Sequence, residues 1–118
     1  MLKKQLTRVK TGQESFEAEV ADNIVKKFWG LSLRNSGKML FVFSRDVKTS
    51  IDMMLLSEPL YLYFLDSDKK VVEKMKAQPW TWSPRTWKLY RPEKKYRYLL
   101  ESFQELKLEK DDVLEFEI

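Results

Sequence analysis

The chain has 118 residues and a formal net charge of +4, and 43% of its residues are hydrophobic and 34% charged. This is the size and composition of one water-soluble domain and excludes a disordered chain. No cysteine or histidine is present and the three glycines are scattered, which excludes disulfides, thiolate nucleophiles, Ser-His-Asp triads and glycine-rich phosphate loops.

No segment has the length and apolar character of a signal peptide or a membrane span. We therefore expect a cytoplasmic protein that has no membrane partner. The high charge combined with only two asparagines favours a thermophilic source. We expect one domain over residues 1–118, in which residues 1–13 form an edge strand or a loose arm.

The first half of the chain shows strand patterns separated by turns. Alternating apolar and polar residues predict a strand over Ser15–Ala21. A short helix is predicted across residues 23–30, where apolar residues four apart share a face and Gly30 ends the helix. The continuous apolar run Met39–Phe43 predicts the next strand.

The middle of the chain predicts a hairpin followed by an irregular segment. Strands are expected over Thr49–Leu56 and Leu60–Leu65, and the polar turn Asp66–Lys69 leads from the second of these into a strand over Val71–Met75. Prolines interrupt the stretch Ala77–Pro92, so we expect a long structured loop or a broken strand there.

The last part of the chain predicts a strand, a helix and a strand. Tyr96–Leu100 has strand character, Ser102–Leu106 begins with a helix-capping serine and carries a glutamate three residues later, and Val113–Ile118 alternates as a strand. Together these elements predict a mainly β, single-domain fold, namely an antiparallel β-sandwich or squashed barrel with two short helices.

Several blocks, in this order along the chain, resemble the family catalogued as domain of unknown function 192: Gly30–Leu31, Arg34, Gly37–Phe43, Pro59–Leu60, Phe64–Asp66, Val71–Val72 and Tyr98–Glu101. The resemblance spans residues 16–116. It implies an uncharacterised protein with a small, mainly β sandwich fold, and the family has no established activity to transfer.

The chain departs from the family at the motif Phe-Trp-Met-Lys-Asn-Thr, which aligns with Ile51–Leu56. Only Met53 keeps its identity there, and the aspartate that follows Pro-Leu in the family is Tyr61. The family's Gly-Asp before the last strand is Asp111–Asp112. For this reason no functional residue is carried over from the family.

The charge is distributed unevenly along the chain. Residues 69–98 carry ten basic and two acidic side chains, whereas residues 101–118 carry two basic and seven acidic ones. The basic segment also contains most of the tryptophans and tyrosines. A segment that is both basic and aromatic suits single-stranded nucleic acid, because bases stack on aromatic rings while cationic side chains follow the phosphates. The candidate binding residues are Trp80, Trp82, Arg85, Trp87, Lys88 and Arg91.

Two alternatives for the same segment remain open. The alternating aromatic residues could fill the core while the basic residues lie on the solvated face. A pocket lined by Trp80, Trp82 and Trp87 could instead hold a sugar or another small ligand, because such pockets have aromatic walls and a few polar groups.

Carboxylates are the remaining candidates for chemistry, in a carboxylate-dependent hydrolase. Asp52 stands among apolar residues that could raise its pKa, whereas Asp66 and Asp68 fit an ordinary turn. We assign no catalytic residue, no metal ligand and no cofactor, and favour a non-enzymatic binding or accessory module. Because Met53–Leu56 is apolar on both faces, this segment could also meet a second subunit in a homodimer.

Overall fold

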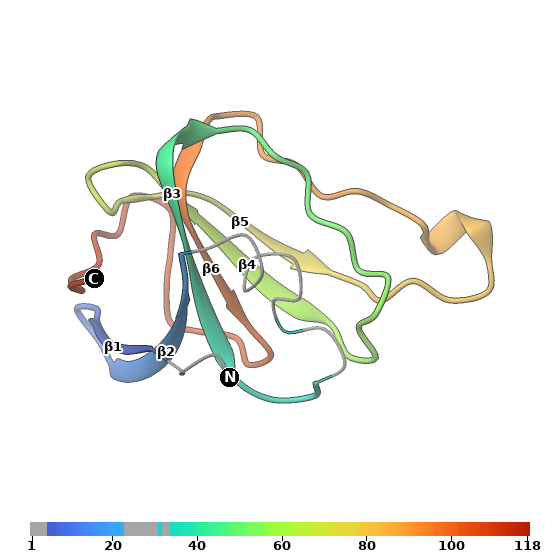
Figure 1. Cartoon of the computed structure of the whole chain (residues 1–118), viewed down its shortest axis with the longest axis horizontal. Coiled ribbons are helices and arrows are strands. Elements are labelled where there is room, and N and C mark those ends of the chain that lie inside the picture. The colour runs from blue at the N-terminus through green and yellow to red at the C-terminus, as the bar shows by residue number, and fades with distance from the viewer. Residues whose placement is uncertain (1–4, 23–30, 32–33) are drawn as a thin grey trace.

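The computed structural model describes residues 5–22, 31 and 34–118 (Figure 1). Its elements are β1 (Leu6–Lys10), β2 (Ser15–Ala21), β3 (Lys38–Val47), β4 (Leu60–Leu65), β5 (Val71–Ala77), the 3₁₀ helix η1 (Pro84–Thr86) and β6 (Tyr96–Ser102). The six strands form one sheet in the order β1-β2-β3-β6-β4-β5. No helix in the described part of the chain has the length and apolar character needed to cross a bilayer.

The mainly β prediction is confirmed, but the expected antiparallel arrangement is wrong at one position. β2 and β3 pair in parallel, whereas the other pairs are antiparallel. The connection over residues 22–37 is long enough for the crossover that a parallel pair requires. The sheet is not closed into a barrel, and the strands of the described residues make no second sheet.

The two predicted helices have different outcomes. The helix expected across residues 23–30 lies outside the described residues. The helix expected over Ser102–Leu106 is wrong, because Ser102 is the last residue of β6. The Ser102 hydroxyl accepts a hydrogen bond from the backbone N–H of Gln104 and donates one to its carbonyl, so the serine stabilises a turn and does not cap a helix.

The predicted strand over Thr49–Leu56 is also wrong. Only Ile51 pairs with another segment, through an isolated bridge to Tyr90. The buried side chains of Met53 and Leu56 lie three residues apart and do not alternate as in a strand. The segment is a loop that covers the sheet, which we call the cover loop (residues 49–56).

The predicted final strand over Val113–Ile118 is replaced by two isolated bridges. Val113 pairs with Lys70 beside β5, and Glu115 pairs with Lys10 in β1. The C-terminal segment therefore links the two outer strands of the sheet without becoming a strand. The predicted alternation of buried and exposed side chains is correct for the first five of these positions.

Both faces of the sheet are buried. The first cluster includes Met39, Phe41, Leu62, Phe64 and Leu99 from the strands and Met53 and Leu56 from the cover loop. The second includes Leu40, Tyr63 and Leu100 from the strands and Leu106, Leu108, Leu114 and Phe116 from the C-terminal segment. The sheet is thus covered by irregular segments on both sides.

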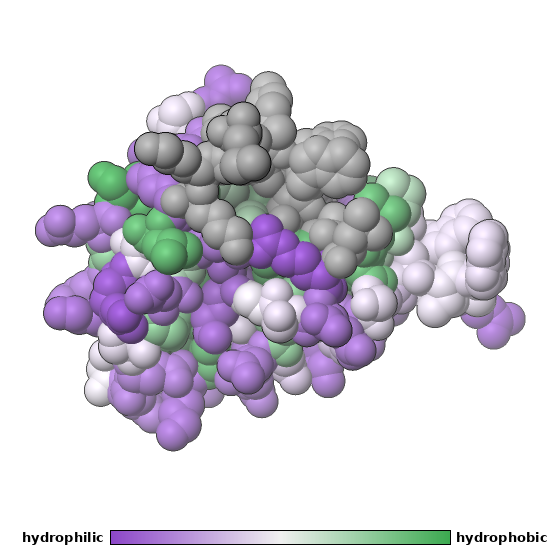
Figure 2. All heavy atoms as spheres, turned by 60° about the horizontal axis from the view of Figure 1, so that its bottom comes forward, coloured by the Kyte–Doolittle hydropathy of each residue, from purple (hydrophilic) through white to green (hydrophobic). Residues whose placement is uncertain are grey.

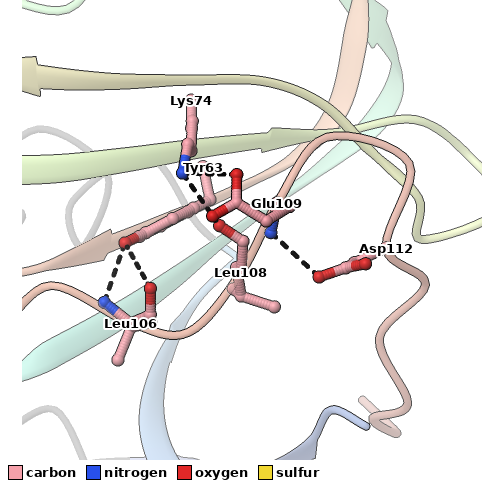
Figure 3. A network of polar contacts seen from close by, with 6 residues as sticks. All are labelled: Tyr63, Lys74, Leu106, Leu108, Glu109 and Asp112. Atoms are coloured by element: carbon pink, nitrogen blue, oxygen red, sulfur yellow. Dashed lines mark hydrogen bonds and ion pairs between the residues drawn. The ribbon is translucent and has the colours of Figure 1, made fainter. Parts of the chain in front are cut away.

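Polar contacts fasten the C-terminal segment to the sheet (Figure 3). The Tyr63 hydroxyl accepts a hydrogen bond of 2.9 Å from the backbone N–H of Leu106, and burial raises the pKa of this tyrosine. Lys74 donates to the carbonyl of Leu108 at 3.2 Å and pairs with Glu109 at 2.8 Å. These contacts hold residues 106–109 against β4 and β5.

Candidate functional site

Residues 78–92 form a loop that extends away from the sheet and carries η1 near its tip (Figure 1). We call it the indole loop. Figure 2 shows it as a lobe of intermediate hydropathy that protrudes from the rest of the surface. All six predicted binding residues lie on this loop, as their nearness in the sequence requires.

The three indoles of this loop lie at different depths. The side chain of Trp80 is partly buried and packs against the first core cluster. Trp82 is 98% exposed and Trp87 is 53% exposed. The rings of Trp80 and Trp87 lie 6.5 Å apart with a tilt of 35°. The core interpretation of the aromatic residues therefore holds for Trp80 in part and is wrong for Trp82.

Hydrogen bonds within the loop hold its shape. The Trp80 indole N–H donates to the carbonyl of Lys88 at 2.8 Å, and the Trp87 indole N–H donates to the carbonyl of Thr81 at 2.7 Å. The Thr86 hydroxyl accepts from the Thr81 backbone N–H at 2.7 Å and donates to a carbonyl at the start of η1. Trp82 is thus presented from an ordered platform.

The base of the indole loop is joined to the cover loop. Ile51 and Tyr90 exchange two backbone hydrogen bonds of 2.8 Å, and the backbone N–H of Trp80 donates to the carbonyl of Met53 at 3.3 Å. Of the eight large apolar side chains exposed in the described part, five lie on these two loops: Met54, Leu55, Trp82, Trp87 and Leu89. Most of the large exposed apolar side chains in the described part therefore lie on these two joined loops.

The same loop is cationic. Arg85, Lys88 and Arg91 are exposed, and residues 77–92 contain no acidic side chain. None of the three forms an ion pair with a residue that the structure describes. Their charges are therefore available to an anionic partner.

The pocket hypothesis for the tryptophans gains no support. Two surface cavities in the described part have volumes of about 310 and 300 Å³. The first is lined by residues of β4, β5 and Glu105, and the second by residues of β1 and the segment 115–117. No tryptophan lines either cavity, so neither encloses the indoles.

The predicted carboxylates have ordinary structural roles. Asp66 accepts backbone hydrogen bonds from Asp68 and Lys70 and thereby shapes the β4–β5 turn, as the sequence predicts. Asp52 is exposed and accepts a hydrogen bond from the backbone N–H of Met54. The described residues contain no group of three side chains that could hold a metal ion.

The carboxyl in an unusual environment is Glu101, which the sequence did not single out. Its residue is only 5% exposed, and burial raises its pKa to about 8, with the nearby charge of Asp52 adding to the effect. The signal in the sequence was its position two residues after Leu99, in strand alternation, because this places both side chains on the same face of the sheet.

The order of the indole loop leads to a first prediction. We expect Thr86→Val to remove the hydroxyl contacts to residues 81 and 83, which are worth about 1 kcal/mol in such settings. The indole proton of Trp87 should then exchange with solvent several-fold faster by NMR, and the melting temperature should fall by no more than a few degrees. Ser44→Ala, which removes an exposed hydroxyl on β3 outside both loops, is the control. Unchanged exchange in Thr86→Val would show that the hydroxyl does not order the loop.

The amino-acid sequence that builds this mixed sheet matches the model of a known family. The model of DUF192, described as "Uncharacterized ACR", matches residues 7–116. The chain belongs to this family of uncharacterised proteins, which confirms the resemblance seen in the sequence. A UPF0127 protein of Pyrococcus abyssi is 31% identical over 88 residues, covering 72% of this chain and 69% of the relative. One from Pyrococcus furiosus is 29% identical over 119 residues, covering 94% and 97%.

Solved structures share the fold. A crystal structure from Sinorhizobium meliloti 1021, described as a candidate transcription regulator, has a TM-score of 0.77 and 21% identity and covers 97% of this chain and 94% of its own. A protein of unknown function from Novosphingobium aromaticivorans has a TM-score of 0.70 and 15% identity, with coverage of 93% and 83%. These similarities establish the architecture.

Proposed function

We propose that this protein is a binding module that holds single-stranded nucleic acid on the indole loop. One observation carries the proposal: Trp82 is 98% exposed on a loop that is ordered by its own hydrogen bonds and contains no acidic residue. An indole with both faces open to water loses solvent-exposed apolar area when a flat partner stacks on it.

The binding mode follows from the geometry of the loop. A base stacked on Trp82 contributes about 1–3 kcal/mol, and this stacking tolerates any base. Arg85, Lys88 and Arg91 attract the phosphates on either side, and release of counterions makes this attraction strongly dependent on salt. Because the loop is ordered before binding, little conformational entropy is lost on association.

The direct test is fluorescence anisotropy with a labelled single-stranded oligonucleotide. We expect Trp82→Ala to weaken binding by about 5- to 100-fold, the equivalent of one lost stacking contact. Lys88→Glu with Arg91→Glu should weaken binding further and flatten its salt dependence. The control is Lys107→Glu with Lys110→Glu, two exposed lysines of the C-terminal segment. This pair changes the net charge equally and should retain most of the binding.

Two results would overturn the proposal. The first is the absence of oligonucleotide binding at low salt. The second is retention by anionic phospholipid vesicles without any binding of oligonucleotide, because tryptophan and cations also suit a lipid surface. A loss of binding in the control pair equal to that in the loop pair would place the site elsewhere.

The cytoplasmic location and the thermophilic source belong to the same proposal. Single-stranded nucleic acid is abundant in the cytoplasm. The relatives from Pyrococcus, together with the charge-rich composition of this chain, support a thermophilic origin.

A further inference from the structure

The structure contains one buried charged residue among those it describes. Glu101 lies near the end of β6, in register with Met39 of β3 and Leu62 of β4. Residues directly opposite in neighbouring strands share a face, so its side chain lies on the face that carries the first core cluster. Burial of a carboxyl in such surroundings favours its neutral form.

The composition gives this residue particular weight. The chain has no histidine and no cysteine, the side chains that most often change charge near neutral pH. Burial brings the pKa of Glu101 to about 8, whereas burial moves the pKa of Tyr63 and Tyr96 further above neutrality. Among the described groups with a shifted pKa, Glu101 alone titrates close to neutrality.

Few other titratable groups face Glu101 from the described elements. Tyr96 of the same strand is one of them, since the charge of Glu101 adds to the effect of burial in raising its pKa. Asp52 of the cover loop disfavours its ionised form. Glu19 of β2 is in register with Met39, which separates it from Glu101, and its carboxylate forms an ion pair with Arg34. The partners at the paired positions of β3 and β4 are apolar. Ionisation of Glu101 therefore creates a charge that repels Asp52 and requires water.

The charge of Asp52 acts on Glu101, and hydrogen bonds join the cover loop that carries Asp52 to the indole loop. Asp52 accepts a hydrogen bond from the backbone N–H of Met54. The neighbouring side chain of Met53 is buried in the first core cluster. The carbonyl of Met53 accepts from Trp80, and Ile51 exchanges two hydrogen bonds with Tyr90. The base of the indole loop is therefore held by backbone hydrogen bonds to the two residues that flank Asp52.

We propose that proton binding at Glu101 controls the position of the indole loop through the cover loop. With Glu101 neutral, the cover loop packs on the sheet and supports Trp80 and Tyr90. With Glu101 ionised, water enters beside the carboxylate, repulsion from Asp52 loosens the cover loop, and the indole loop loses its support. This inference rests on the proposed function, and it predicts that nucleic acid binds more strongly below pH 8 than above it.

The test follows the indole N–H signals of the tryptophans by NMR between pH 6 and 9.5. In the wild-type protein we expect the signals of Trp80 and Trp87 to shift with one midpoint near pH 8. Glu101→Gln should abolish this midpoint, and Asp52→Asn should lower it, because a neighbouring negative charge is removed. Glu105→Gln, at an exposed glutamate four residues later in the chain, should leave the midpoint in place.

The same variants measured with the labelled oligonucleotide at pH 6.5 and 9 complete the test. Wild-type binding should weaken several-fold at the higher pH, and binding by Glu101→Gln should not. Indole signals that stay constant in the wild-type protein, or that still titrate in Glu101→Gln, would overturn the coupling. Oligonucleotide binding that is present but independent of pH would refute the coupling and leave the proposed function intact. A titration of the indole signals near pH 8 without any oligonucleotide binding would refute the proposed function and leave the coupling intact.

Discussion

Replacing Glu101 by glutamine is expected to stabilise the protein by roughly 3–5 kcal/mol at pH 9 and to change its stability little at pH 4.5. The folded-state pKa of Glu101 is about 8, against an ordinary value of 4.5. Between these values the folded protein binds the proton more tightly than the unfolded chain. The free energy of unfolding therefore falls as the pH rises from about 4.5 to 8, and a glutamine, which carries no proton to lose, escapes this loss.

Urea denaturation at pH 5, 7 and 9 measures the effect, because the midpoint reports stability when the slope is unchanged. The difference between wild type and Glu101→Gln should grow steadily over this series. Glu105→Gln is exposed and should follow the wild type at each pH. Parallel pH profiles for the wild type and Glu101→Gln would show that the Glu101 carboxyl is solvated in the folded protein.

Replacing Leu108 by alanine is expected to destabilise the protein by about 2–5 kcal/mol, although Leu108 belongs to no strand or helix. The residue is fully buried in the second core cluster, where its loss leaves a cavity between the C-terminal segment and the sheet. Its backbone carbonyl also accepts a hydrogen bond from Lys74, so the segment is held in place while the side chain is removed.

Leu89→Ala is the matched control, since the same atoms are removed from a side chain that is 63% exposed on the indole loop. It should change the free energy of unfolding by no more than about 0.5 kcal/mol. Both variants are compared by urea or thermal denaturation. Equal, small effects would mean that the C-terminal segment is not an integral part of the core.

The sequence predicted correctly those strands that alternate between polar and apolar residues or that end at turn-forming residues. Ser15–Ala21 alternates cleanly, and Leu60–Leu65 is followed by the turn around Asp66; both strands have the predicted bounds. Apolar runs that pack as loops were not distinguished from strands. The cover loop buries two side chains three residues apart, and only tertiary contacts with the sheet and with Tyr90 determine that spacing.

Local signals also failed where tertiary hydrogen bonds decide the conformation. Ser102 has the pattern of a helix cap, yet β6 continues to that residue because it pairs with both β3 and β4. The parallel pairing of β2 and β3 depends on the path of a long connection, which periodicity does not report.

The sequence indicated which segment carries the candidate site, but not which of its tryptophans are exposed and which are partly buried. The basic and aromatic composition identified the segment that contains the indole loop. Whether Trp80 or Trp82 is exposed depends on contacts with residues far away in the sequence, such as the hydrogen bond from Trp80 to Met53. Glu101 was missed because a glutamate at the end of a strand is usually solvated, and its burial depends on segments that cover the sheet.

The most direct measurement of the central claim is an NMR titration of the indole N–H signals with an unlabelled single-stranded oligonucleotide at low salt. Our account predicts that the signal of Trp82 moves most and that of Trp87 next, with the shifts reversed by added salt. Signals that remain in place while the oligonucleotide is bound, or shifts confined to residues outside 78–92, would contradict it.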